Sequence, residues 1–295
     1  MMTDLKQWTA LITPMENDGS IHFESLRRMV ERQEAAENGI LLIGSTGEGL
    51  ALSDSEKKEV VDFVSGINPD VPLMVGVGGM NLSVQTEWVE YCNTLNIDAF
   101  LMVTPLYSKP GPEGQYQWFK ALLDRSEKPC MLYNIPSRTG IDLPFVVAEK
   151  LAEHRNMWSI KEASGSLAVF REFRERVPGI PLYSGDDALV SIFRPYGCSG
   201  SVSVASNAWP EATKLYTNLC LSGKTESLFP LWNRAVKALF SASNPIPVKK
   251  LLHSRGEISS ATLRLPLTED ELTDLTELET IDNEINNWYK ENYEQ

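Results

Sequence analysis

The chain has 295 residues, of which 42% are hydrophobic and 23% charged, a composition typical of a globular protein with a large apolar core. Its 40 acidic and 27 basic residues give a formal charge of −13, the wrong sign for a general binder of nucleic acids or anionic membranes. No apolar run approaches the length of a membrane span, and the opening MMTDLKQWTA lacks the pattern of a secretory signal, so we expect a cytoplasmic protein.

Eight short runs rich in β-branched and apolar residues predict strands at 8–12, 40–44, 73–77, 99–104, 131–135, 157–161, 182–184 and 201–204. Amphipathic stretches between and after them predict helices at 23–37, 54–65, 84–94, 115–125, 143–153, 168–176, 188–196 and 211–221. Several strands are continuously apolar, as parallel strands covered on both faces should be. Eight βα units predict an α/β fold of the (β/α)8 TIM-barrel type.

An open, doubly wound sheet is the competing architecture. Its dinucleotide fingerprint would lie between the first strand and the first helix, where this chain has Thr13-Pro14-Met15-Glu16-Asn17. The glycine-rich segments 44–49 and 76–79 also lack a P-loop pattern. The sequence therefore gives no support to a nucleotide site.

Helices alone are expected after residue 223, which divides the chain into a barrel domain, 1–223, and a C-terminal helical domain, 224–295. We expect helices at 226–242, at a segment opened by Asn244-Pro245-Ile246-Pro247, and at 269–292. The last helix has an apolar stripe at spacings of three and four, which indicates packing. Its members are Leu272, Leu275, Leu278, Ile281 and Ile285.

Cysteine and histidine are too few and too scattered to suggest the common metal or disulfide sites. The cysteines form no C-x-x-C pair and are interpreted as buried thiols in a reducing compartment; they are Cys92, Cys130, Cys198 and Cys220. No histidine falls at the C-terminal end of a predicted strand; the three are His22, His154 and His253. This argues against a histidine-ligated zinc site and against a Ser-His-Asp triad, and favours an amine for any carbonyl chemistry.

Lys161 lies in the apolar stretch 157–163, at the end of a predicted buried strand. A buried lysine loses its preference for the ammonium form, and the free amine can condense with a ketone to form a Schiff base. Lowering its pKa from about 10.4 to about 7 requires roughly 4.6 kcal/mol against the charged form. The alternative is a lysine whose stem packs while its head reaches solvent.

Barrel active sites lie where the strands end, and several polar residues close these strands. The loop 44–49, GSTGEG, could turn backbone N–H groups towards a carboxylate, or be a simple turn before the helix. Tyr133 could be catalytic or a packed core tyrosine, and Arg138 a substrate ligand or a surface residue.

Five segments together resemble one family: GSTGEG, YNIPSRTG, IKEASGS, SGDDA and NPIPVK. They are similar to those of the dihydrodipicolinate synthase and N-acetylneuraminate lyase family of pyruvate-dependent class I aldolases, in the same order over essentially the whole chain. The resemblance implies a TIM barrel with a C-terminal helical domain. It also implies a homo-oligomer, usually a tetramer built as a dimer of dimers.

YNIPSRTG resembles the dihydrodipicolinate synthase branch, where Arg138 matches the arginine that binds the carboxylate of L-aspartate-4-semialdehyde. Lys161 matches the lysine that forms the imine with pyruvate. Tyr133 matches the proton donor and acceptor, linked through Ser45 to Tyr107, which in the family reaches in from a neighbouring subunit.

The resemblance further implies that the backbone of Ser45 and Thr46 holds the carboxylate of pyruvate, with the Val202 carbonyl near the imine. No metal and no organic cofactor are expected. Ser45 stands where many synthases have threonine, and a serine there is common in the lyases. This departure from the synthase pattern still preserves a hydroxyl. The product implied is 4-hydroxy-tetrahydrodipicolinate, in the lysine and diaminopimelate pathway.

Three rival functions remain open. One is another aldolase or lyase of the same family that acts on N-acetylneuraminate or 2-keto-3-deoxygluconate. Another is a catalytically silent binding protein, because a fold does not guarantee a function. The last is metal-dependent chemistry through Glu48, Asp186 and Asp187, for which the sequence offers few ligands.

The resemblance also bears on regulation. At the positions that match the lysine-binding pocket of lysine-inhibited relatives, this chain has Leu106, Asp54, Lys57, Met80 and Val84. Leu106 offers no phenol, Val84 cannot pair with an ammonium group, and Lys57 would repel one. A ligand without differential contacts cannot shift an equilibrium, so we expect L-lysine to inhibit weakly or not at all.

Overall fold

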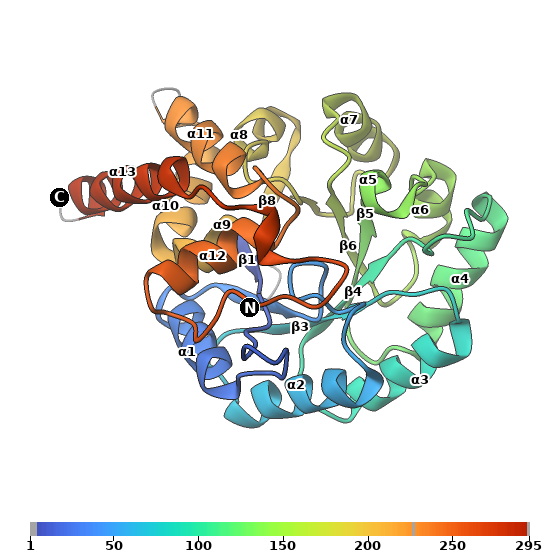
Figure 1. Ribbon diagram of the computed structural model, residues 1–295. Helices are drawn as coiled ribbons and strands as arrows, with labels where there is room; N and C mark the ends of the chain where they lie inside the picture. Colours follow the sequence, from blue (N-terminus) through green and yellow to red (C-terminus); the bar gives the residue numbers. More distant parts are fainter. Residues whose placement is uncertain (1–4, 226–227, 294–295) are drawn as a thin grey trace.

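In the computed structural model, which describes residues 5–225 and 228–293, eight parallel strands close into a barrel in sequential order, with β8 paired to β1 (Figure 1). The strands are β1 Gln7–Ala10, β2 Gly39–Leu42, β3 Leu73–Val77, β4 Ala99–Val103, β5 Cys130–Asn134, β6 Met157–Glu162, β7 Leu182–Ser184 and β8 Cys198–Ser203. Each predicted strand overlaps an observed one. The predicted TIM barrel is confirmed, and the open doubly wound sheet is wrong.

Helices ring the barrel in Figure 1 and cover the outer face of the sheet. They are α1 Phe23–Ala35, α2 Asp54–Ile67, α3 Leu82–Asn93, α4 Pro112–Arg125, α5 Pro136–Thr139, α6 Phe145–Leu151, α7 Leu167–Arg176, α8 Val190–Phe193, the 3-10 helix η2 Arg194–Tyr196, α9 Ala205–Ala208 and α10 Pro210–Ser222. The sequence pattern did not predict the short helices α5 and α9, each of which directly follows the end of a strand.

Two apolar layers hold the barrel together. Alternate strand residues point into the barrel and fill it, among them Trp8, Leu41, Met74, Met131 and Val202. The intervening residues pack outwards against the helices in a second, larger cluster. Because both faces are buried, the strands read as continuous apolar runs, and the few polar side chains near their C-terminal ends are conspicuous.

The C-terminal helices lie on one side of the barrel, next to α9 and α10 (Figure 1). They are α11 Phe229–Leu239, α12 Ile246–Ser254, the 3-10 helix η3 Glu269–Glu271 and α13 Thr276–Tyr293. Trp232 of α11 stacks on Tyr216 of α10 with ring centroids 4.2 Å apart and meets Trp288 of α13 edge-on. The division at residue 223 stays a prediction, and residues 226–227 of the expected helix 226–242 lie outside the described residues.

The start expected for the last helix, residue 269, is wrong. Residues 269–271 form the isolated turn η3, capped by the Thr268 side chain, and Leu272 then adopts an extended backbone conformation. The helix α13 begins only at Thr276, whose N–H donates to the Asp274 carboxylate at 2.9 Å. Side-chain oxygens of Thr and Asp compete with helical hydrogen bonds, and here they divide the acidic segment into two pieces.

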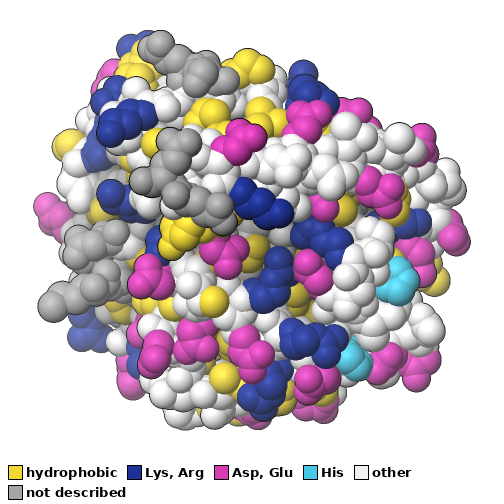
Figure 2. All heavy atoms as spheres, turned by 90° about the vertical axis from the view of Figure 1, so that its left-hand side faces the viewer, with side chains coloured by type: hydrophobic (Ala, Val, Ile, Leu, Met, Phe, Trp, Pro, Cys, Tyr) yellow, Lys and Arg dark blue, Asp and Glu magenta, His cyan; other side chains and the backbone are white. Residues whose placement is uncertain are grey.

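Figure 2 looks at the side on which the C-terminal helices lie, and acidic and basic side chains are interspersed over it. On this face the negative charge of the chain is therefore not gathered into one patch. Within residues 5–225 and 228–293, no helix is both long and apolar enough to cross a membrane.

Candidate active site

Lys161 is buried near the end of β6, with 5% of its surface exposed. It pairs in register with Tyr133 on β5, and its Nζ lies 4.2 Å from the centroid of the Tyr133 ring. Gly185, which follows β7, leaves room for the lysine stem, since a Cβ there would lie 2.7 Å from Lys161 Cε. The head of Lys161 does not reach bulk solvent, so the alternative of a snorkelling lysine is wrong.

The surroundings of Lys161 favour its neutral form. Burial lowers its pKa from 10.5 to about 7; Asp187 acts in the opposite direction, and the Arg138 guanidinium lowers the pKa further. This shift corresponds to about 5 kcal/mol against the ammonium form. A substantial fraction of Lys161 is therefore a free amine near neutral pH, which is the form that attacks a carbonyl carbon.

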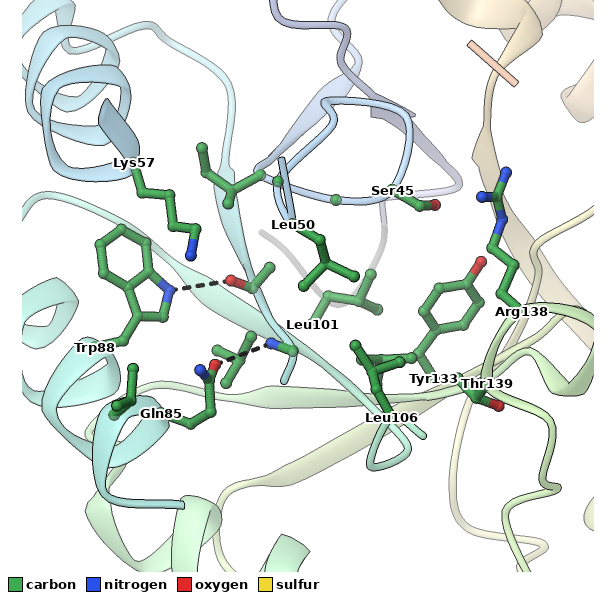
Figure 3. Close-up of a pocket in the computed structure, with 18 of the residues that line it drawn as sticks. Ser45, Leu50, Lys57, Gln85, Trp88, Leu101, Leu106, Tyr133, Arg138 and Thr139 are labelled. Carbon is green, nitrogen blue, oxygen red and sulfur yellow. Dashed lines mark hydrogen bonds between the residues drawn. The ribbon is translucent and has the colours of Figure 1, made fainter. Parts of the chain in front are cut away.

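Tyr133 is buried beside this amine, with 7% of its surface exposed. Burial raises its pKa to about 12, while Arg138 and a hydrogen bond with the Ser45 side chain lower the pKa. In Figure 3 the Ser45 hydroxyl and the Arg138 guanidinium lie near the phenol. The phenol thus keeps its proton at neutral pH and lies close to groups that can stabilise its ionised form.

The loop 44–49 lies between β2 and α2 and carries Ser45 and Thr46. Thr46 is buried, and its hydroxyl accepts a hydrogen bond from Asn244 Nδ2 at 3.0 Å. The helix α2 has its own N-cap, Ser53, whose side chain forms a capping box with Glu56. The helix thus starts at the residue that the simple-turn interpretation expected, so the cap does not distinguish that interpretation from a carboxylate-binding loop.

A cavity of about 440 Å³ opens beside Ser45, Tyr133 and Arg138, and it continues between α2 and α3 (Figure 3). In the figure Leu50, Leu101 and Leu106 separate these three residues from a second group around Lys57 and Trp88. The cavity therefore joins the barrel mouth to a second end between the two helices, where charged side chains from α2 and α3 line it beside Val84 and Trp88.

The last two expected site residues differ from each other in burial. Val202, on β8, is buried in the same interior cluster as Tyr133. Tyr107 lies in the loop after β4, is 85% exposed and has a φ of 65°, a left-handed conformation that is uncommon for a residue with a side chain. Within one chain, Tyr107 is not packed into the site.

Sequence reasoning missed one polar residue of the site, Asn244, and considered another, Asp187, only for metal-dependent chemistry. The Asp187 carboxylate accepts hydrogen bonds from the N–H groups of Val204 and Ala205 at 3.0 and 3.1 Å, and burial raises its pKa. Asn244 bonds Thr46, and its carbonyl accepts from Arg138 Nη2 at 3.5 Å. Both residues lie in the segments SGDDA and NPIPVK, so a signal was present, but no spacing rule connected Asp187 to Lys161 or Asn244 to Thr46.

No group of three His, Cys, Asp or Glu side chains within the described residues could hold a metal ion. Two donors considered from sequence are engaged elsewhere: Glu48 pairs with Lys249, and Asp187 binds two backbone N–H groups. Asp186 accepts from the N–H of Ala188, a local turn contact.

Comparisons with known proteins agree over nearly the whole chain. The model of the dihydrodipicolinate synthetase family matches residues 5–284. A 4-hydroxy-tetrahydrodipicolinate synthase of Francisella tularensis subsp. novicida is 47% identical over 96% of this chain and 96% of its own. Among solved structures, the chloride-inhibited dihydrodipicolinate synthase from Acinetobacter baumannii complexed with pyruvate has a TM-score of 0.85 and 33% identity, covering 97% of this chain and 98% of that one. The lysine-bound enzyme from Cyanidioschyzon merolae has a TM-score of 0.89 and 30% identity, covering 96% and 99%.

Proposed function

The chain belongs to the dihydrodipicolinate synthetase family, and we propose that it is a lyase that condenses pyruvate with L-aspartate-4-semialdehyde to 4-hydroxy-tetrahydrodipicolinate. The observation that carries this proposal is the buried Lys161 amine, with a pKa of about 7, beside the phenol of Tyr133. The complex of the Acinetobacter baumannii relative with pyruvate supports the choice of the first substrate.

In the proposed reaction the Lys161 amine adds to the ketone carbon of pyruvate and water leaves, which gives an imine. Loss of a methyl proton yields an enamine, whose carbon adds to the aldehyde of the second substrate. The amino group of that substrate then attacks the imine carbon, closes the ring and releases Lys161 as the free amine. Tyr133 carries protons to and from these centres, and Ser45 helps to stabilise its ionised form.

The carboxylates of both substrates need separate donors. The backbone of Ser45 and Thr46 is proposed to hold the carboxylate of pyruvate, with the Val202 carbonyl near the imine. Arg138, at the rim of the cavity, is proposed to hold the carboxylate of the semialdehyde through two parallel hydrogen bonds. Because lysine and tyrosine supply the nucleophile and the proton transfer, the proposal requires no metal and no organic cofactor.

A second subunit is part of the proposal. Tyr107 is 85% exposed, and the neighbouring loops expose Leu50 and Met80 to 68% and 60%. Large apolar side chains exposed together mark a surface that another protein covers. We propose a homo-oligomer, a dimer of dimers, in which Tyr107 completes the site of the neighbouring subunit.

The test is an initial-rate assay with purified protein and pyruvate. L-aspartate-4-semialdehyde should be consumed with formation of the cyclic product, whereas N-acetylneuraminate and 2-keto-3-deoxygluconate should not be cleaved. Turnover of either sugar acid in preference to the semialdehyde would assign the chain to another branch of the family, and no turnover at all would favour a binding protein.

A further inference from the structure

Lys249, on α12, is completely buried, although lysine is among the residues least often found inside a protein. Its Nζ donates to Glu48 Oε1 at 2.5 Å and to the Thr262 carbonyl at 2.8 Å. The second oxygen of Glu48 accepts from the N–H of Arg264 at 2.9 Å. The proposed chemistry gives this fully paired, buried set of charges no role.

Glu48 belongs to the loop 44–49, whose backbone is proposed to bind the carboxylate of pyruvate. Two residues of this region with side chains, Glu48 and Ile43, have left-handed φ values of 54° and 59°. Gly49 packs so closely on Ile43 that a Cβ would lie 2.3 Å from its carbonyl oxygen. Such a backbone persists only where the surroundings hold it in place.

The contacts that hold the backbone of loop 44–49 in place come from one short stretch of the C-terminal region. Lys249 binds Glu48, Asn244 binds the Thr46 hydroxyl at 3.0 Å, and the Asn244 carbonyl accepts from Arg138 at 3.5 Å. Residues 244–249 thus contact both proposed carboxylate-binding elements. A buried ion pair adds little net stability over an apolar pair of equal volume. It does, however, fix the relative orientation of the two segments that carry the charges.

We infer that Lys249 is a positioning residue for pyruvate: through Glu48 it sets the backbone of loop 44–49 so that the N–H groups of Ser45 and Thr46 face the substrate carboxylate. This inference rests on the proposed function. It assigns the C-terminal region a direct part in substrate binding, beyond covering the barrel.

The experiment measures borohydride trapping of pyruvate on the intact protein as a function of pyruvate concentration, together with kcat and the KM for semialdehyde. Lys249→Met leaves Glu48 buried without its partner. The concentration that gives half-maximal trapping should rise about tenfold, the scale of losing one hydrogen bond to a charged group. The kcat at saturating pyruvate should change far less.

Two comparisons separate positioning from general destabilisation. Arg255→Met breaks a different ion pair, which is partly buried and joins the end of the same helix to Asp282, without touching loop 44–49. It should lower Tm and leave half-maximal trapping unchanged. Acetone has the same reacting carbonyl without a carboxylate, so its trapping should be equal on wild type and Lys249→Met.

The inference is overturned if Lys249→Met, or Glu48→Gln should the first variant not fold, lowers Tm while half-maximal trapping of pyruvate stays within twofold of wild type. It is also overturned if acetone and pyruvate lose trapping equally. Wild type that traps no pyruvate would instead contradict the proposed function itself.

Discussion

At the scale of single residues, the charge state of Lys161 is set by three influences of known sign. Burial and Arg138 lower its pKa, and Asp187 raises it, with a result near 7. A lysine poised there is present both as the amine, which attacks a carbonyl, and as the ammonium, which can donate a proton. Arg138 also lines the cavity, so the side chain proposed to bind the semialdehyde also lowers the pKa of the nucleophile.

The first prediction concerns pH. Lys161 is protonated and unreactive below its pKa of about 7 and neutral above it. The rate of imine formation with pyruvate should therefore rise through neutral pH and level off well before the ordinary lysine pKa of 10.5. Single-turnover trapping at a series of pH values checks this, and a rate that keeps increasing towards 10.5 would show that the amine is not activated.

The second prediction concerns Arg138→Ala. Losing a charged donor of two hydrogen bonds should cost the semialdehyde on the order of 1.5–3 kcal/mol of binding, seen as a higher KM. Imine formation with pyruvate should survive, provided that it is measured above pH 8, because removal of the guanidinium lets the pKa of Lys161 rise. Arg138→Lys is the matched control, since it keeps the charge without the paired geometry. Equal loss of both steps would indicate a structural role for Arg138.

At the scale of elements, strand positions follow from sequence because each βα unit is local. Alternation of apolar runs and amphipathic stretches places Tyr133 and Lys161 at the ends of adjacent strands, and the register confirms that they are neighbours. Contacts between distant segments leave no such periodic trace. The pairs Lys249 with Glu48 and Asn244 with Thr46 join residues about 200 positions apart, and only the closed fold brings them together.

The ends of elements were predicted less well, because local hydrogen bonds compete with helix formation. Asp274 and Thr268 interrupt the acidic segment that looked like one long helix. Tyr107 is a different case: its role in a neighbouring site, known only from resemblance, remains a prediction that a single chain does not test.

The third prediction concerns the cavity between α2 and α3. Four of the five positions expected to matter for lysine inhibition line it: Asp54, Lys57, Val84 and Leu106. Lys57 pairs with Asp54 at 3.0 Å, so one of the carboxylates that line the cavity is already engaged by a lysine of the chain. L-lysine should therefore barely lower the initial rate. Strong, saturable inhibition below about a millimolar would contradict this expectation, and so would lysine bound between subunits in a crystal.

At the scale of the whole molecule, the C-terminal helices and the proposed second subunit cover different parts of the barrel. The helices α11 to α13 lie beside α9 and α10, whereas Leu50, Met80 and Tyr107 lie in the loops after β2, β3 and β4. The C-terminal region contacts loop 44–49 of its own chain, through Lys249 and Asn244. The proposed second subunit would instead contribute Tyr107 to the site.

The fourth prediction tests this division by mixing two inactive variants, Tyr107→Phe and Lys161→Arg. If Tyr107 acts across an interface, subunit exchange creates mixed dimers with one complete site, and roughly a quarter of wild-type activity should return. Each variant exchanged with itself is the control. No recovery, with mixed dimers demonstrated by native mass spectrometry, would place Tyr107 in the site of its own subunit, and an active Tyr107→Phe variant would place it outside catalysis.

The most direct test of the central claim is borohydride reduction in the presence of pyruvate, followed by peptide mass mapping. Wild type should gain one reduced pyruvate adduct, and the modified peptide should carry it on Lys161. Lys161→Arg keeps a positive charge without a nucleophilic amine and should gain none. An adduct on another lysine of wild type, or undiminished trapping on Lys161→Arg, would contradict the account.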